Sequence, residues 1–433
     1  MKILLVGGGG REHALAWKIS LSNQCEKLFC APGNAGIEEC AECVDIGAED
    51  IDNIVKFTLE NNIDLVIVGP EAPLVKGLAD RLKSEGINVF GPSAQAAQLE
   101  GSKGFMKDLC TRFDIPTAAY GRFTDLNEAK EFIQKQGAPI VVKADGLAGG
   151  KGVIIAQTED EAISAAEDML SGEMFNKAGN EIVIEQFLDG EELSYFALSD
   201  GKTVLPLTSA QDHKRAYDGD EGPNTGGMGA YSPAHLINDE LEQKIIERII
   251  EPTINGMAEM GVPFQGILFA GVMVIDNEPY LLEHNVRFGD HECQAIMMRL
   301  ETDLVALLNA CATGELAAYK DKLEWSVNSA LCVVMAAKGY PGSFNKDTVI
   351  NLENTEEQPQ SKIFHAGTKR DSQGQLVNFG GRVFGVTAQA ENIAQARDQA
   401  YDIVNEIDWP EGYYRRDIGW RAIATENKAK SYA

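Results

Sequence analysis

Short apolar runs alternate with helical patterns over the first hundred residues. Three of them, at 3–6, 65–68 and 87–90, are each about the length of one buried strand. Strands that alternate with helices predict an α/β domain with a parallel sheet. Turns rich in glycine or proline follow several of these strands, at 7–10, 31–36, 69–73 and 91–92. Because open parallel sheets bind ligands at the carboxyl ends of their strands, we expect these turns to line one wall of a site.

The pattern changes after Ser102 and Lys103, where a helix is predicted to run toward Phe113. Strands are predicted at 140–143, 152–156, 181–187, 193–199, 203–207, 267–275, 279–283, 330–337 and 381–388. Predicted helices at 159–170 and 391–406 accompany the strands on either side of them. The pattern of apolar and polar positions changes again near Trp325, which indicates a compact C-terminal unit. We therefore predict a mixed α/β and α+β protein with domains at 1–101, 102–325 and 326–433, the middle one carrying a small lobe at about 120–190.

Composition narrows the class of protein. A chain of 433 residues that is 44% hydrophobic can bury several cores, and it has no apolar run of the roughly 18 residues that a membrane span needs. The formal charge of −28 disfavours nucleic acid and anionic membranes as partners. The first residues lack the apolar segment of a secretory signal, so eight cysteines indicate reduced thiols in the cytoplasm. We interpret the Cys40 and Cys43 pair as ordinary residues rather than a metal or redox site.

The first glycine run, 7–10, resembles a dinucleotide-binding turn only in part. A third glycine is required at position 12, where the chain has Glu12. The turn can still bind phosphate through backbone N–H groups at a helix start. A plain tight turn is the alternative.

A second glycine-rich loop runs from Lys143 to Gly152. Its spacing approaches that of a phosphate-binding P-loop but fails at Asp145 and at Gly152. What remains is Lys143 at a strand end, a flexible loop and a second lysine. We expect such a loop to fold over a triphosphate and neutralise its charge. The residues expected to act in it are Gly149, Gly150 and Lys151.

Two acidic segments are candidates for nucleotide and metal binding. Between the strands that flank 186–190, free backbone groups can pair with an adenine edge, although a hairpin with solvated acids is the favoured interpretation without context. On the later strand, Glu283 and Asn285 are two residues apart and therefore share a face. Hard oxygen ligands of this kind suit Mg²⁺. Arg287 follows on that face, where it can bind phosphate or carboxylate, whereas His284 should point away as a structural residue.

Both charge signs lie beside a glycine turn in the segment 211–231. Asp212 and Lys214 precede the run from Pro223 to Tyr231, which contains three glycines. An aspartate can hold an ammonium group and a lysine a carboxylate, so a zwitterionic substrate is indicated. An ordered surface loop is the alternative.

Taken together, the motifs resemble those of the phosphoribosylamine–glycine ligases of the ATP-grasp superfamily, and the resemblance spans almost the whole chain. The motifs that carry it are Gly8-Gly-Gly-Arg-Glu-His-Ala14, Ala31-Pro-Gly-Asn-Ala-Gly36, Val68-Gly-Pro-Glu-Ala-Pro-Leu74, Lys143-Ala-Asp-Gly-Leu, Gln211-Asp-His-Lys-Arg215, Pro223 to Tyr231, Arg287-Phe-Gly-Asp290, Ala366-Gly-Thr and Asp417 to Ala422. The resemblance implies a Rossmann-like domain, an ATP-grasp domain and a C-terminal domain. It also implies ligation of glycine to 5-phosphoribosylamine with ATP, through glycyl phosphate, in purine biosynthesis.

Site roles also follow from the resemblance. Lys103 and Lys143 would bind ATP phosphates. Glu185 with the backbone of Gln186, Phe187 and Leu188 would bind adenine, and Glu192 would bind ribose. Glu283 and Asn285 would bind Mg²⁺ or Mn²⁺. The residues expected to face the substrates are Asp212, Lys214, Arg287 and Asp290. We also expect a cytoplasmic monomer.

The chain departs from the family pattern after Arg287-Phe-Gly-Asp290, where His291 stands in place of the usual proline. Three rival functions remain open. Another ATP-grasp carboxylate–amine ligase would differ in the segment 211–231. A Rossmann NAD(P) oxidoreductase is disfavoured by Glu12, and a nucleotide-binding protein without catalysis would be expected to lack the paired Glu283 and Asn285.

Overall fold

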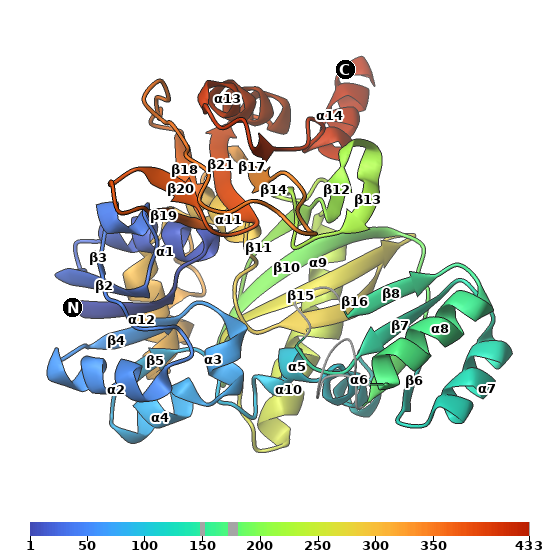
Figure 1. The fold of residues 1–433 in the computed structure, drawn as a ribbon. Helices are drawn as coiled ribbons and strands as arrows, with labels where there is room; N and C mark the ends of the chain where they lie inside the picture. Colours follow the sequence, from blue (N-terminus) through green and yellow to red (C-terminus); the bar gives the residue numbers. More distant parts are fainter. Residues whose placement is uncertain (148–151, 172–180, 433) are drawn as a thin grey trace.

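A computed structural model describes residues 1–147, 152–171 and 181–432 of the chain. Three groups of elements surround a long central sheet (Figure 1). The N-terminal part and the small lobe lie at opposite ends of the view, and the C-terminal part lies above them (Figure 1). Within the described residues, no helix is long and apolar enough to cross a lipid bilayer.

The N-terminal part contains a five-stranded sheet in the order β3-β2-β1-β4-β5, and every neighbouring pair is parallel. Its strands are β1 (Lys2–Gly7), β2 (Lys27–Pro32), β3 (Glu42–Cys43), β4 (Leu65–Val68) and β5 (Asn88–Phe90). The accompanying helices are α1 (Gly10–Ser20), α2 (Ile51–Glu60), α3 (Glu71–Val75), α4 (Leu78–Ser84) and α5 (Gln98–Gly101). Both faces of β1 are buried, as continuous apolar runs in parallel sheets predict. The expected α/β arrangement is confirmed here.

The small lobe is a four-stranded antiparallel sheet in the order β6-β9-β7-β8 with two helices packed on it. Its strands are β6 (Tyr120–Phe123), β7 (Ile140–Ala144), β8 (Val153–Ala156) and β9 (Ile182–Gln186), and its helices are α7 (Leu126–Gln136) and α8 (Glu159–Leu170). Helix α6 (Lys103–Arg112) leads into the lobe and begins at Ser102, whose hydroxyl accepts from the Phe105 N–H. The helix predicted from Ser102 and Lys103 therefore begins where the sequence indicated.

A nine-stranded sheet connects the middle of the chain to its C-terminal part. The strands are β10 (Glu191–Asp200), β11 (Val204–Asp212), β14 (Gly229–Ser232), β15 (Gln265–Ile275), β16 (Glu278–Asn285), β17 (Ser329–Ala337), β18 (Ser361–His365), β21 (Arg382–Ala390) and β22 (Gly412–Tyr413). Antiparallel pairing of β14 with β17 carries the sheet across the boundary expected near residue 325. The C-terminal unit is thus continuous in hydrogen bonding with the middle one.

Several elements had no clear signal in the sequence. They are η1 (Ile37–Glu39), β12 (Arg215–Tyr217), η3 (Asp218–Asp220), β13 (Glu221–Asn224), α9 (Asp239–Ile245), the π-helix η4 (Ile246–Ile250), α10 (Glu251–Glu259), α11 (Glu292–Arg299), α12 (Leu304–Thr313), η5 (Leu316–Tyr319), β19 (Thr368–Arg370), β20 (Leu376–Asn378) and α14 (Trp420–Tyr432). All eight residues of α11 are buried, so it lacks the polar face by which a helix is recognised. The predicted helix at 391–406 is α13 (Ile393–Glu406).

Asn34 joins the N-terminal part to the C-terminal part. Its side-chain amide donates to the carbonyls of Gly8 at 2.9 Å and His365 at 2.8 Å. Its carbonyl oxygen accepts from the N–H groups of Gly36 and Ile37. Since Asn34 is buried, these bonds replace water for every group involved.

We expect Asn34→Ala to lower the free energy of unfolding by about 2–4 kcal/mol, because it leaves several buried backbone groups without partners. Asn53→Ala is the matched control, since the Asn53 side chain makes one exposed hydrogen bond, to Asp50. Urea unfolding followed by tryptophan fluorescence compares the two. Equal stability of both variants would show that the Asn34 bonds do not hold the two parts together.

Candidate active site

The first glycine turn binds protein carboxylates. The Gly9 N–H donates to Glu12 at 2.7 Å, and the Arg11 N–H donates to Asp290 Oδ1 at 3.1 Å. A Cβ on Gly8 would lie 2.5 Å from the Gly33 carbonyl oxygen, so the turn also packs closely on its neighbour. The backbone N–H groups at the start of this helix therefore donate to side chains of the protein itself. The contacts are those of a tight turn, and phosphate binding by this run stays a prediction.

Asp290 contacts all three parts of the chain. Besides the Arg11 N–H, it accepts from Gln294 at 2.9 Å on α11, and it pairs with Arg382 of β21 at 3.5 Å. Burial alone would raise its pKa, but Arg382 and Arg11 outweigh burial and lower the pKa of Asp290 to about 2. Asp290 is therefore ionised at neutral pH. Arg382 was not predicted from the sequence, where a lone arginine after two glycines gave no signal.

Arg287 is held by two glutamates of the N-terminal part. Its guanidinium lies 3.3 Å from Glu71 and 3.0 Å from Glu100, and it also donates to Asn285 Oδ1 at 3.1 Å. Glu71 belongs to the 69–73 turn, which was expected to line the site, whereas Glu100 was not predicted. The ion pairs fix the position of Arg287 across the interface between the two parts.

Two of the residues predicted to bind nucleotide, Lys143 and Glu185, contact each other directly. Glu185 on β9 forms ion pairs with both Lys143 and Lys107, and all three side chains are buried. Burial would raise the pKa of Glu185, but the two lysines outweigh it and lower that pKa. Lys107 was missed, although it lies one helical turn after Lys103 on α6 and so shares its face.

The other nucleotide residues are only partly described. Lys103 Nζ donates to the Gly146 carbonyl at 3.0 Å, and burial lowers its pKa. The Gln186 N–H, expected to be free for adenine, instead donates to the Ala119 carbonyl at 2.9 Å. Phe187 and Leu188 are half-buried after β9. Gly149, Gly150 and Lys151 lie outside the described residues.

Glu283 and Asn285 lie on one face of β16, as predicted. Burial alone would raise the pKa of Glu283, but Lys214, Lys143 and other cations outweigh it and lower the pKa. Within the described residues, no group donates a hydrogen bond to this carboxylate. An ionised carboxylate without a donor, beside an amide oxygen, fits Mg²⁺ or Mn²⁺. His284 points the other way, as expected, and bonds Thr253 at 3.0 Å.

The segment 211–231 brings charged groups beside this strand. Lys214 pairs with Glu192, the residue predicted for ribose. Asp212 lies at the end of β11, with oxygen atoms near those of Glu292. Burial, with Glu192 and Glu292, raises the pKa of Asp212 to about 7, although Lys214 opposes this. Asp212 and Lys214, both predicted to face the substrates, thus lie near enough for each to affect the pKa of the other.

His291 occupies a backbone conformation that proline cannot adopt. Its φ is 102°, whereas proline is fixed near −65°. Its imidazole contacts Gly227 of the glycine turn, so that a Cβ at Gly227 would overlap the ring. The His291 ring and the positive φ of Gly227 each disfavour a side chain at Gly227.

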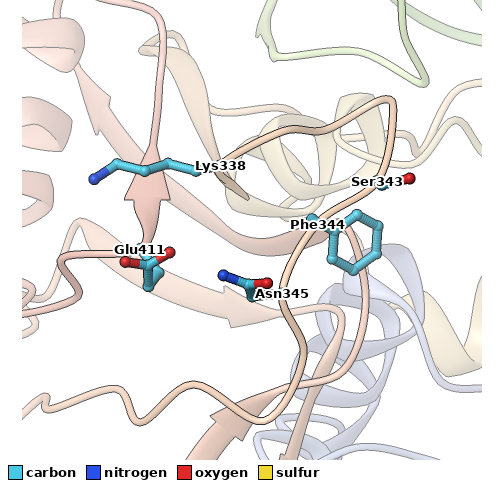
Figure 2. Close-up of a pocket in the computed structure, with 5 residues that line it drawn as sticks. All are labelled: Lys338, Ser343, Phe344, Asn345 and Glu411. Carbon is cyan, nitrogen blue, oxygen red and sulfur yellow. The ribbon is translucent and has the colours of Figure 1, made fainter.

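A separate pocket of about 270 Å³ follows the end of β17 (Figure 2). Its lining residues are Lys338, Ser343, Phe344, Asn345 and Glu411 (Figure 2). None of the predicted site residues lines it. The charged residues described above, rather than this hollow, locate the candidate site.

The chain matches three family models, which together span most of its length. They are the phosphoribosylglycinamide synthetase N domain at residues 1–100, the ATP-grasp (A) domain at 101–293 and the C domain at 330–421. Phosphoribosylamine–glycine ligase of Brucella melitensis is 58% identical over 427 residues, which are 98% of this chain and 99% of that protein. The enzyme of that name from Escherichia coli K12 is 50% identical, over 98% of this chain and all of its own length.

Solved structures agree with these relatives. The crystal structure of phosphoribosylamine–glycine ligase from Thermotoga maritima has a TM-score of 0.84 at 32% identity, covering 96% of this chain and 100% of that one. The biotin carboxylase domain of a Hydrogenobacter thermophilus 2-oxoglutarate carboxylase has a TM-score of 0.74 at 17% identity, covering 95% and 91%. At that identity it shows a shared fold alone.

We expect Gly227→Ala to destabilise the protein by about 2–5 kcal/mol, because it adds both backbone strain and overlap with the His291 ring. Gly86→Ala is the matched control. Gly86 also has positive φ, at 78°, but a Cβ there would have no heavy atom within 4 Å, so strain alone of about 1–2 kcal/mol is expected. Urea unfolding measures both variants. Further substitution of His291→Ala should recover the difference between them, and no recovery would contradict the contact.

Proposed function

The chain belongs to the phosphoribosylamine–glycine ligase family, an ATP-dependent ligase family of purine biosynthesis, and from this premise we propose how its residues divide the reaction. The ligase joins glycine to 5-phosphoribosylamine. The observation that carries the assignment is the buried, ionised Glu283, which has cations from several elements around it and no hydrogen-bond donor among the described residues. Glycine would first react with the terminal phosphate of ATP, and the amine would then react with the resulting glycyl phosphate.

In the first step the glycine carboxylate attacks the γ-phosphorus of ATP, and ADP leaves. Negative charge accumulates on the transferring group, so positive side chains placed around it lower the barrier. Lys103, Lys143, Lys214 and Arg287 all act electrostatically on Glu283 and are the groups available for this. No nucleophilic side chain is required.

Glu283 and Asn285 would hold Mg²⁺ or Mn²⁺. A divalent cation held there would supply positive charge to neutralise the phosphates of the nucleotide. Arg287 donates to Asn285 Oδ1, and this bond fixes the orientation of the amide. Gly271 opposite Glu283 leaves room for that side chain, since a Cβ there would lie 3.2 Å from Glu283 Cγ.

The nucleotide would lie between α6, the small lobe and β16. Lys143 and Lys103 would bind its phosphates, Glu185 with the 186–188 backbone its base, and Glu192 its ribose. In the structure, glutamates already pair with Lys143 and Lys214. Triphosphate oxygens would compete with Glu185 for Lys143, and a substrate carboxylate would compete with Glu192 for Lys214.

The substrates would be recognised by opposite charges from neighbouring elements. Asp212 would take an ammonium or amino group and Lys214 a carboxylate. Arg287 and Asp290 would fix the segment after β16 against them, since both are anchored to other parts of the chain. We propose that the protein acts as a cytoplasmic monomer. All eight cysteines are free thiols, which fits a reducing compartment.

We expect Glu283→Ala to reduce ADP release at least about 100-fold, because the cation and its charge neutralisation are lost. ADP is measured with ATP, Mg²⁺ and glycine, with and without freshly generated phosphoribosylamine. Glu278→Ala, at the other end of β16, is the control. Glu278 pairs with Lys244 and Arg248, away from the site.

Wild-type ADP release should require glycine together with an amine that consumes glycyl phosphate, either phosphoribosylamine or hydroxylamine. The Glu278 variant should behave like wild type. Release that needs neither substrate would contradict the ligase assignment. A Glu283→Ala variant with undiminished turnover at every Mg²⁺ concentration would contradict the proposed metal ligand.

A further inference from the structure

Two carboxyl groups without a lysine or arginine partner lie beside the substrate residues. One oxygen of Asp212, one of Glu292 and one imidazole nitrogen of His291 all lie within 4.8 Å of one another. Asp212 is half-buried, whereas Glu292 and His291 are only 3% and 2% exposed. Across residues 1–147, 152–171 and 181–432, no lysine or arginine forms a salt bridge with either carboxylate. Such groups are costly to bury unless a ligand supplies the missing donors.

His291 lies beside the pair, with its Nδ1 3.7 Å from Glu292 Oε2. Burial lowers its pKa to about 4, so its imidazole is neutral at physiological pH. Nδ1 lies in hydrogen-bonding contact with the Asp290 carbonyl and therefore carries the proton. Nε2 is then an acceptor, and it is buried without a hydrogen-bond partner. Among the described residues, Glu292 accepts from its own backbone N–H and, weakly, from the Ser194 hydroxyl at 3.5 Å.

The chemistry of this cluster favours an amine over a metal ion. His291 Nδ1 lies 3.7 Å from Glu292 Oε2 and carries the imidazole proton, so it has no lone pair to offer a metal ion. An amino group carries several N–H donors and little or no fixed charge. It can therefore donate hydrogen bonds to both carboxyl groups together.

Resting on the proposed function, we propose that Asp212 and Glu292 bind the amino group of phosphoribosylamine and accept its proton in the second step. The amine nitrogen forms a bond to the carbonyl carbon of glycyl phosphate. The bond from that carbon to the phosphate oxygen breaks, and phosphate leaves with its electron pair. One N–H proton passes to a carboxylate oxygen of the pair, so atoms and charge balance.

The electrostatics of the pair suit this task. Burial raises the pKa of both carboxyl groups, and the negative charges of Glu192 and Glu292 add to burial in raising the pKa of Asp212 to about 7. A base whose pKa lies near the working pH transfers protons most effectively. Two close carboxyl groups also share a proton readily. Glu292 thus has a role that its sequence position, directly after His291, gave no reason to expect.

The test separates the two steps on the same protein sample. Hydroxylamine reacts with acyl phosphates without help from a base, so glycine hydroxamate formation from ATP, Mg²⁺, glycine and hydroxylamine reports the first step alone. Glycinamide ribonucleotide formation reports both steps. Glu292→Gln and Asp212→Asn keep the side-chain shape, and Glu259→Gln on exposed α10 is the control.

In each site variant we expect glycinamide ribonucleotide formation to fall about 100-fold while hydroxamate formation changes less than about threefold. Because the result is a ratio of two assays, partial misfolding would lower both equally and cannot produce the split. Equal loss in both assays, or no loss in either, would overturn the inference. Wild-type protein that forms neither product would overturn the proposed function itself.

Discussion

A single ionised carboxylate, that of Asp290, connects the beginning, middle and end of the chain. It receives the Arg11 N–H from the first helix and the Arg382 guanidinium from a C-terminal strand. A charge in such surroundings is stable only while its partners are in place, so these contacts require the three parts to pack together. The segment that carries Asp290 also carries Arg287 and Glu292. The candidate site is therefore assembled by the same contacts that join the domains.

The charged side chains around Glu283 are likewise held in position by ion pairs. The chain has a formal charge of −28, yet lysines and arginines gather around Glu283. Acidic residues hold them there: Glu185 pairs with Lys143, and Glu192 pairs with Lys214. An acidic surface with a local concentration of cations attracts small phosphate-bearing substrates to one place and disfavours polyanions elsewhere.

Sequence reasoning succeeded where a pattern is local. Apolar runs predicted the strands, because buried parallel strands are continuous in hydrophobicity. The alternation along β16 placed Glu283 and Asn285 on one face and His284 on the other. The family resemblance, carried by motifs along almost the whole chain, is confirmed by the relatives and the solved structures.

What depends on distant residues was not predictable. Arg382 contacts Asp290, which lies 92 positions earlier in the sequence. Nothing in the sequence around Arg382 indicates that partner. Lys107 was detectable in principle, one turn after Lys103, but its pairing with Glu185 depends on how β9 packs against α6. The continuity of the central sheet beyond residue 325 was invisible for the same reason. The assigned site roles remain predictions.

A double-mutant cycle on Asp290→Asn and Arg382→Gln tests most directly whether this carboxylate joins the parts of the chain. Urea unfolding gives the free energy for wild type, both single variants and the double variant. The account predicts that the double variant is destabilised by less than the sum of the two single variants, with a coupling of about 1–3 kcal/mol. Additive effects, within about 0.5 kcal/mol, would contradict it.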